Sequence, residues 1–291
     1  MKELLRVYQS SRTHWVGDGF PVRSVFDYNG LGKELSPFLL LDYVAPYEFP
    51  PTDARRGVEA HPHKGFETVT IAFQGEVEHR DSSGGGGRIG PGDVQWMTAG
   101  KGIVHEEFQS EEFSRKGGTF QMVQLWVNLR AQDKNTKPRY QNLLKGQIPV
   151  GALSENAGTV RVIAGNFAGT KGPAKTFTPI NLWDVSLRAG KSAELPLPNG
   201  HTSIFLVLTG EVTVTGGSDV APGNLAIFAR TGEGIAIKAK SDARLLVMGG
   251  EPIAEPVVGR GPFVMNTHAE IQKAFEEYQT GLMGRIAEAA V

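Results

Sequence analysis

The sequence predicts an all-β chain that folds as two strand-rich domains and ends in a short helix. Apolar or alternating segments recur about every 8–12 residues across the first half, and the rhythm resumes from Val160 to Met248. Tight turns separate these segments, in keeping with 37 glycines and 17 prolines. Strand segments at this spacing indicate antiparallel sandwiches or barrels.

The expected strands of the first half follow in chain order. They cover residues 20–26, 37–44, 66–73, 77–81, 94–98, 103–107 and 120–129. Turns are expected at residues 74–76, 90–93 and 100–102, because each contains glycine. We expect a first domain at residues 1–135, a linker at 136–150 where periodicity is lost, and a second domain at 151–291.

The final helix is predicted from a cap and a helical spacing of apolar residues. Asn266 or Thr267 can accept hydrogen bonds from the first turn. The apolar residues that recur at helical spacing behind this cap are Ile271, Phe275, Tyr278 and Leu282. We place this helix at the end of the second domain.

Composition excludes several classes of function. The 291 residues contain no cysteine, so disulfides, thiol nucleophiles and zinc–thiolate sites are excluded. The formal net charge of −1 gives no support to direct nucleic-acid binding or to an anionic membrane partner. No run of apolar residues reaches the length of a membrane span, so we expect a cytoplasmic protein.

Three of the seven histidines lie at the two ends of the segment from His61 to Glu107. Alternate residues of a strand point to the same face, so His61 and His63 project together, as do His105 and Glu107. If the two strands pair or face each other, three imidazoles and one carboxylate converge. The sequence therefore predicts a metal site with nitrogen and oxygen ligands, which suits iron, manganese, nickel, copper, cobalt or zinc.

Other residues compete with these four. Glu106 is the alternative carboxylate, but it points to the opposite face unless a bulge intervenes. His79 is expected to be solvated on a hairpin, whereas His14, His201 and His268 have no partner motif and are interpreted as structural. The core is expected to contain the tryptophans Trp96, Trp126 and Trp183. Gln124 can either reach the pocket or form a hydrogen bond across strands.

Two segments resemble nucleotide-binding motifs, but the residues around them do not fit such motifs. Residues 85–90 have the spacing G-x-G-x-x-G, but a strand rather than a helix follows them. Residues 190–192 resemble the end of a phosphate-binding loop, yet Val185 stands where its first glycine is required.

The two halves resemble each other, which predicts an internal duplication. TVTIAFQGEV at residues 68–77 parallels SIFLVLTGEV at residues 203–212. Aligning the glycines of these segments places Pro196 and Pro198 where His61 and His63 stand. A second alignment places Ile237 and Ala239 where His105 and Glu107 stand, so the second half is expected to lack all four ligands.

Four stretches resemble the cupin superfamily and, more closely, the pirin family. They read HPHKGFET at residues 61–68, PGDVQWMTAG at 91–100, LWVNLR at 125–130 and GPFVMNT at 261–267. The resemblance implies a bicupin fold of two packed barrels (double-stranded β-helices) with iron in the first. It also implies that His61, His63, His105 and Glu107 are the metal ligands, whereas Glu67 is not a ligand.

The resemblance implies two kinds of function. One is an oxidoreductase, a quercetin 2,3-dioxygenase (quercetinase) that cleaves flavonols with dioxygen, in which Glu107 takes the proton of a substrate hydroxyl. The other is an iron-dependent interaction protein that binds a transcription factor or a metabolic enzyme. Fe(II) is the expected metal in both, and an open apolar cleft above it favours the enzyme.

Overall fold

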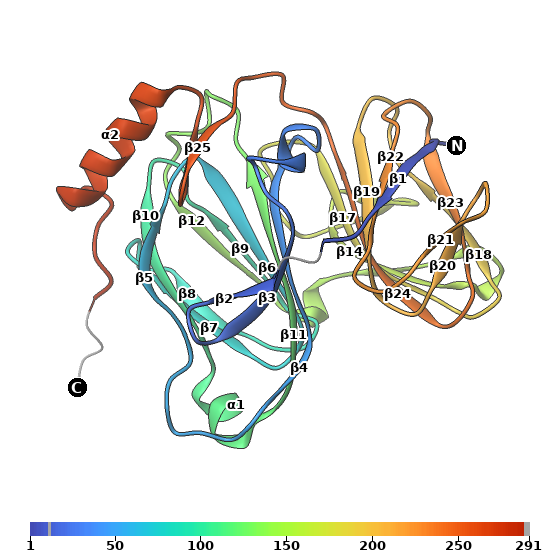
Figure 1. The fold of residues 1–291 in the computed structure, drawn as a ribbon, viewed down its shortest axis with the longest axis horizontal. Coiled ribbons are helices and arrows are strands. Elements are labelled where there is room, and N and C mark those ends of the chain that lie inside the picture. Colours follow the sequence, from blue (N-terminus) through green and yellow to red (C-terminus); the bar gives the residue numbers. More distant parts are fainter. Residues whose placement is uncertain (11–12, 288–291) are drawn as a thin grey trace. The chain divides into compact units, whose positions relative to one another are not determined.

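The structure is a computed structural model that describes residues 1–10 and 13–287, and antiparallel strands dominate it (Figure 1). The described residues form two α-helices, α1 (Glu111–Lys116) and α2 (His268–Gln279), and neither is long and apolar enough to cross a membrane. The chain divides into two compact units. We call them the first barrel (residues 13–34, 38–145 and 253–287) and the second barrel (residues 1–10, 35–37 and 146–252). The all-β prediction is confirmed.

The first barrel contains two antiparallel sheets. Seven strands form one sheet, in the order β12 (Arg139–Leu143), β9 (Val94–Thr98), β6 (Phe66–Gln74), β11 (Gly118–Asn128), β4 (Phe38–Phe49), β3 (Phe20–Phe26) and β2 (Thr13–Val16). Four strands form the other, in the order β5 (Gly57–His63), β10 (Ile103–Gln109), β7 (Val77–Asp81) and β8 (Gly86–Ile89). Val44 and Met122 from the larger sheet pack with Val77 and Ile89 from the smaller one, so the core lies between the sheets.

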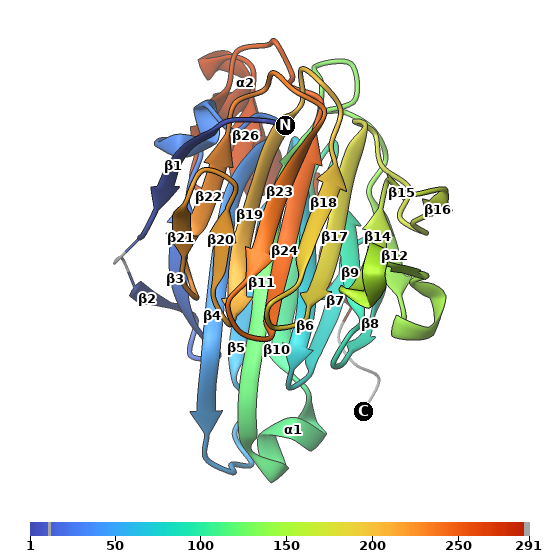
Figure 2. The same ribbon diagram turned by 90° about the vertical axis from the view of Figure 1, so that its right-hand side faces the viewer.

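The second barrel has the same construction, and its long strands lie side by side in Figure 2. Its larger sheet runs β1 (Leu4–Tyr8), β22 (Leu225–Phe228), β19 (Thr202–Thr209), β24 (Ala243–Gly250), β17 (Ile180–Leu187), β14 (Gly158–Ala164) and β13 (Val150–Ala152). Its smaller sheet runs β18 (Ser192–Pro196), β23 (Gly234–Ala239), β20 (Val212–Val214) and β21 (Ser218–Val220). The shared strand order supports the predicted duplication.

The strand register corrects one part of that duplication. In the first barrel, β10 pairs with β5 so that His105 faces His61 and Ile103 faces His63. In the second, β23 pairs with β18 so that Ile237 faces Ala193 and Ile235 faces Leu195. The counterparts of His61 and His63 are therefore Ala193 and Leu195. The assignment to Pro196 and Pro198 was wrong because the loop between β18 and β19 is longer than the loop between β5 and β6.

The chain is divided between the barrels differently from the expected boundaries. The expected linker, residues 136–150, contains β12, which pairs with β9 at the edge of the first barrel. Strand β1 pairs with β22 in the second barrel. The last segment, with α2, belongs to the first barrel and not to the second. Periodicity identifies a strand or a helix, but it does not say which sheet the element joins.

The C-terminal segment completes the first barrel through β25 (Val258–Arg260), β26 (Phe263–Met265) and α2. Thr267 caps α2 and forms a capping box with Glu270, as one of the two predicted caps requires. Ile271 is buried against Phe263, but Leu282 is 76% exposed and lies beyond the helix end. The apolar face of α2 is therefore shorter than its sequence pattern indicates.

Two buried ionisable side chains, Lys134 and Glu67, form hydrogen bonds inside the first barrel. Lys134 is 1% exposed and donates hydrogen bonds to Asn128 Oδ1 and to the carbonyl oxygens of Gly65 and Val264, at 2.7, 2.8 and 3.0 Å. Burial lowers the pKa of Lys134 to about 7. Glu67 on β6 is 1% exposed and accepts a hydrogen bond from Thr98 Oγ1 at 2.7 Å. Burial raises the pKa of Glu67 to about 7.

The raised pKa of Glu67 predicts a pH-dependent stability. Its protonated form is favoured in the folded state, so its contribution is complete below about pH 4.5 and is lost as the pH rises to about 7. A shift of this size corresponds to about 3 kcal/mol. We expect Glu67→Gln to abolish this loss, measured by urea unfolding of both proteins at intervals between pH 4.5 and 7. Lys134 affects stability between about pH 7 and 10.5, outside this window.

The matched control is Glu276→Gln, which changes an exposed carboxylate on α2. This variant should retain the wild-type dependence of the unfolding free energy on pH. Parallel pH curves for wild type and Glu67→Gln would contradict the prediction.

Candidate metal centre

Three predicted ligands meet at the paired strands β5 and β10. His61 and His63 lie on one face of β5, and His105 lies opposite His61 on β10. One side-chain nitrogen from each of the three rings can be chosen so that all three lie within 4.8 Å of one another. His61 is half-buried, whereas His63 and His105 are buried. The structure therefore brings the three histidines together, and His61 is the member that reaches the surface.

Each of the three imidazoles is held through its Nδ1 atom. His61 Nδ1 lies 2.8 Å from the carbonyl oxygen of Glu59, and His63 Nδ1 lies 3.4 Å from that of Pro262. A carbonyl oxygen only accepts, so these two rings carry their proton on Nδ1 and keep a lone pair on Nε2. His105 Nδ1 lies 3.2 Å from His79 Nδ1.

The chemistry of this nitrogen set fits a metal cation. Burial, together with the neighbouring His61, lowers the pKa of His63 and of His105 well below the ordinary value, so both rings are neutral. His105 Nε2 is buried without a hydrogen-bond partner in the described chain. A buried polar atom without a partner is costly, and a cation bound by the three rings would satisfy it.

Glu107 lies on the same face of β10 as His105, but it is not part of the three-histidine group. Its carboxylate and one nitrogen each of His79 and His105 all lie within 4.8 Å of one another. Gln95 Nε2 donates to its Oε1 at 2.7 Å, and Gln124 Nε2 donates to its Oε2 at 2.8 Å. These amides fix the orientation of the carboxylate. Gln124 thus does reach the site.

Glu106 lies on the opposite face of β10, where Arg80 and Arg55 approach its carboxylate at 2.6 and 3.2 Å. The register of β10 and β5 does shift at this point: Glu107 faces Val58, so β5 carries one extra residue. Because the irregularity is on β5, the alternation of side chains along β10 is preserved.

The expectation that His79 is solvated was wrong. Its residue is 1% exposed, and its ring lies between His105 and Tyr140, stacking on Tyr140 with centroids 4.9 Å apart. His79 Nε2 contacts Asp81 Oδ2 at 3.0 Å. Sequence reasoning missed this group, although one signal was present. His79 and Asp81 lie two and four residues after Val77, so on strand β7 all three side chains share the buried face.

Asp81 is ionised in this setting. Burial alone would raise its pKa, but the hydrogen bonds from His79 and Ser83 outweigh burial and lower the pKa below its ordinary value. Tyr140, in the expected linker, donates from its hydroxyl to Gln95 Oε1 at 3.3 Å. Polar groups therefore form a continuous hydrogen-bonded layer behind the histidines.

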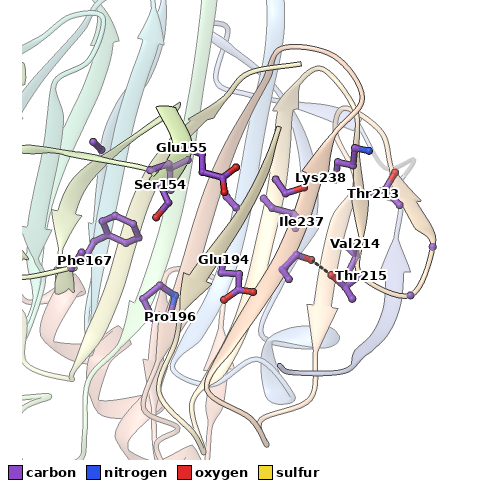
Figure 3. Close-up of a pocket in the computed structure, with 18 residues that line it drawn as sticks. Ser154, Glu155, Phe167, Glu194, Pro196, Thr213, Val214, Thr215, Ile237 and Lys238 are labelled. Carbon is purple, nitrogen blue, oxygen red and sulfur yellow. Dashed lines mark hydrogen bonds between the residues drawn. The ribbon is translucent and has the colours of Figure 1, made fainter. Parts of the chain in front are cut away.

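The equivalent positions of the second barrel are apolar. The counterparts of the polar residues on β5, β10 and β7 all belong to its hydrophobic core: Ala193, Leu195, Ile237, Ala239, Val212 and Val214. A cavity of about 900 Å³ is lined in part by Ala193, Val214 and Ile237, with Phe167 on one side (Figure 3). These core side chains offer no metal ligand.

Comparison with known proteins identifies the family. The pirin family model matches residues 19–127, and the model of the pirin C-terminal cupin domain matches residues 182–284. A Pseudomonas aeruginosa protein named "Putative quercetin 2,3-dioxygenase" is 54% identical, covering 97% of this chain and 98% of its own. Human pirin is 38% identical, covering 87% of this chain and 84% of its own.

A solved structure shares the whole fold. The crystal structure named quercetin 2,3-dioxygenase from Acinetobacter baumannii is 52% identical and has a TM-score of 0.95, covering 99% of this chain and 100% of that one. The predicted bicupin fold is thereby confirmed. The chain belongs to the pirin family.

Proposed function

We propose that the first barrel holds one divalent metal ion, expected to be Fe(II), through His61, His63, His105 and Glu107. The observation that carries this proposal is the group of three imidazoles within ligand distance of one another, in which the buried Nε2 atom of His105 has no hydrogen-bond partner among the described residues. Glu107 is proposed as the fourth ligand because it shares a face of β10 with His105 and because one of its carboxylate oxygens lies within 4.8 Å of a nitrogen of that ring. Three imidazoles and a carboxylate leave positions open on an octahedral ion.

We propose further that this site supports dioxygen-dependent cleavage of quercetin or a related flavonol. A bound divalent ion would supply Lewis acidity, which lowers the pKa of a hydroxyl group placed against it. Glu107 would accept the hydroxyl proton, since its carboxylate is held in one orientation by Gln95 and Gln124. The buried aromatic face of Trp126, whose ring centroid lies 5.1 Å from that of His63, would help to exclude water. The names of two relatives at 54% and 52% identity support this reaction.

A second function is favoured by the burial of the site. His63, His105 and Glu107 are at most 4% exposed, and His61 alone of the proposed ligands is half-buried. A closed site suits a protein in which the metal alters the surface for a protein partner, and the similarity to human pirin supports this alternative. Turnover distinguishes the two functions.

The metal ligands can be tested with a pair of adjacent carboxylates. We expect Glu107→Gln to weaken binding of iron, because it removes an anionic ligand, whereas Glu106→Gln should bind iron as the wild type does. His105→Ala should abolish stoichiometric metal. Metal content after purification and dialysis, measured by mass spectrometry, gives the result. Equal losses in the two glutamine variants would refute the proposed role of Glu107.

The activity can be tested by aerobic turnover of quercetin. Iron-loaded protein should remove the flavonol absorbance with one equivalent of dioxygen consumed, and His63→Ala should lower the rate at least tenfold because a ligand is lost. Free iron at the same concentration is the control. If the wild-type rate equals that of free iron, or His63→Ala retains the full rate, the interaction protein is the better account.

A further inference from the structure

One of the three histidines is held in a different way from the other two. His61 and His63 donate to backbone carbonyl oxygens, which have no proton to give. The Nδ1 atom of His105 instead faces another ring nitrogen, His79 Nδ1, at 3.2 Å. A neutral imidazole nitrogen can donate or accept, so the proton of His105 depends on the protonation pattern of His79.

Asp81 determines which ring nitrogen of His79 carries the proton. Oδ2 of Asp81 lies 3.0 Å from His79 Nε2, and the side chains of both residues are 0% exposed. Oδ1 of Asp81 accepts from Ser83 N, Ser83 Oγ and Gly85 N at 2.8, 2.6 and 3.0 Å. Because three donors surround Oδ1, this side chain is a carboxylate, and its Oδ2 atom can only accept. His79 therefore carries its proton on Nε2 and has a lone pair on Nδ1.

Gln95 leads to the same conclusion by an independent route. Its amide is oriented at both ends, because Oε1 accepts from Tyr140 and Nε2 donates to the carboxylate of Glu107. The same Nε2 lies 3.3 Å from His79 Nδ1, so its second hydrogen is directed at that atom. His79 Nδ1 is thus an acceptor approached by both Gln95 and His105.

We propose that Asp81 and His79 are positioning residues that hold His105 in the tautomer protonated on Nδ1, with its Nε2 lone pair free. The relay runs from Asp81 Oδ2 through the two rings and ends at the partnerless Nε2 atom of His105. Its use in metal binding rests on the proposed function above, but the tautomer itself does not. Through this relay, the availability of His105 Nε2 as a metal ligand depends on the carboxylate of Asp81, which contacts His79 and not His105.

The division of contacts between the two oxygens of Asp81 allows a sharp test. In Asp81→Asn, Oδ1 can still accept from Ser83 and Gly85, whereas an NH₂ group replaces Oδ2 and donates to His79 Nε2. The proton of His79 then moves to Nδ1, where it displaces the hydrogen bond from Gln95 Nε2, and His105 must carry its proton on Nε2. Long-range ¹H–¹⁵N spectra of metal-free protein labelled in histidine, assigned with His105→Ala, read the tautomer directly.

We expect the spectrum of the wild type to show His105 protonated on Nδ1 and that of Asp81→Asn to show it protonated on Nε2. The affinity for Zn²⁺, used as a redox-inert probe in titration calorimetry, should fall about 10- to 100-fold in the variant. Ser83→Ala is the matched control, because it removes a hydrogen bond at Oδ1 and leaves Oδ2 unchanged. It should keep the wild-type tautomer and affinity.

Two results would overturn the relay: His105 protonated on Nε2 in the wild type, or an unchanged tautomer in folded Asp81→Asn. The first is decisive even if the variant does not fold. A wild type that has the expected tautomer but binds no Zn²⁺ supports the relay and contradicts the proposed metal site. Failure of quercetin turnover leaves the spectra unaffected, so the two proposals fail separately.

Discussion

The antiparallel register between β5 and β10 is the constraint on which the site depends. It places His105 opposite His61 and His63 two residues farther along β5, opposite Ile103, so three rings from two strands occupy one face. The extra residue in β5 between Val58 and His61 bends this strand without disturbing the alternation along β10. Since a shift of β5 or β10 by one residue would turn the histidines of the shifted strand to the other face, the pairing has little freedom to vary.

A buried cluster of this kind requires a second layer of partners. Burial keeps His63 and His105 neutral, and each neutral ring has one nitrogen that must donate and one that must accept. Backbone carbonyls fulfil the donor requirement for two rings, and the Asp81–His79 pair fulfils it for the third. The second barrel has the same topology but does not need such a layer of partners. There, the equivalent strands carry only apolar side chains into the core, which need no partners.

The sequence supports accurate predictions where the interactions are local or periodic. The strand at residues 20–26, the strand that begins at residue 103 and the cap at Thr267 follow from alternation and capping chemistry, and the structure has all three. The pairing of His61 with His63 follows from the same period of two. The histidine cluster was predictable because its members repeat this period at two turn-bounded strands.

The misses share one cause, which is that they depend on pairing between distant segments. Tyr140 on β12 stacks on the ring of His79, and β12 lies in the expected linker. Pairing of β1 with β22 similarly joins the start of the chain to a strand more than two hundred residues later. The proline assignment failed for a related reason, because an ungapped comparison cannot register a longer loop. Alternation marks a strand, but it does not say which distant strand pairs with it.

The hydrogen bond between His63 and the Pro262 carbonyl has a consequence for biosynthesis. The ribosome completes the two main sheets of the first barrel by residue 143. The segment that supplies Pro262, and the Val264 carbonyl bound by Lys134, emerges only after the second barrel has been translated. Until then, the nascent first barrel lacks both the partner that orients His63 and an acceptor for a buried ammonium group. Translation order therefore delays completion of the histidine cluster until nearly the whole polypeptide has been synthesised.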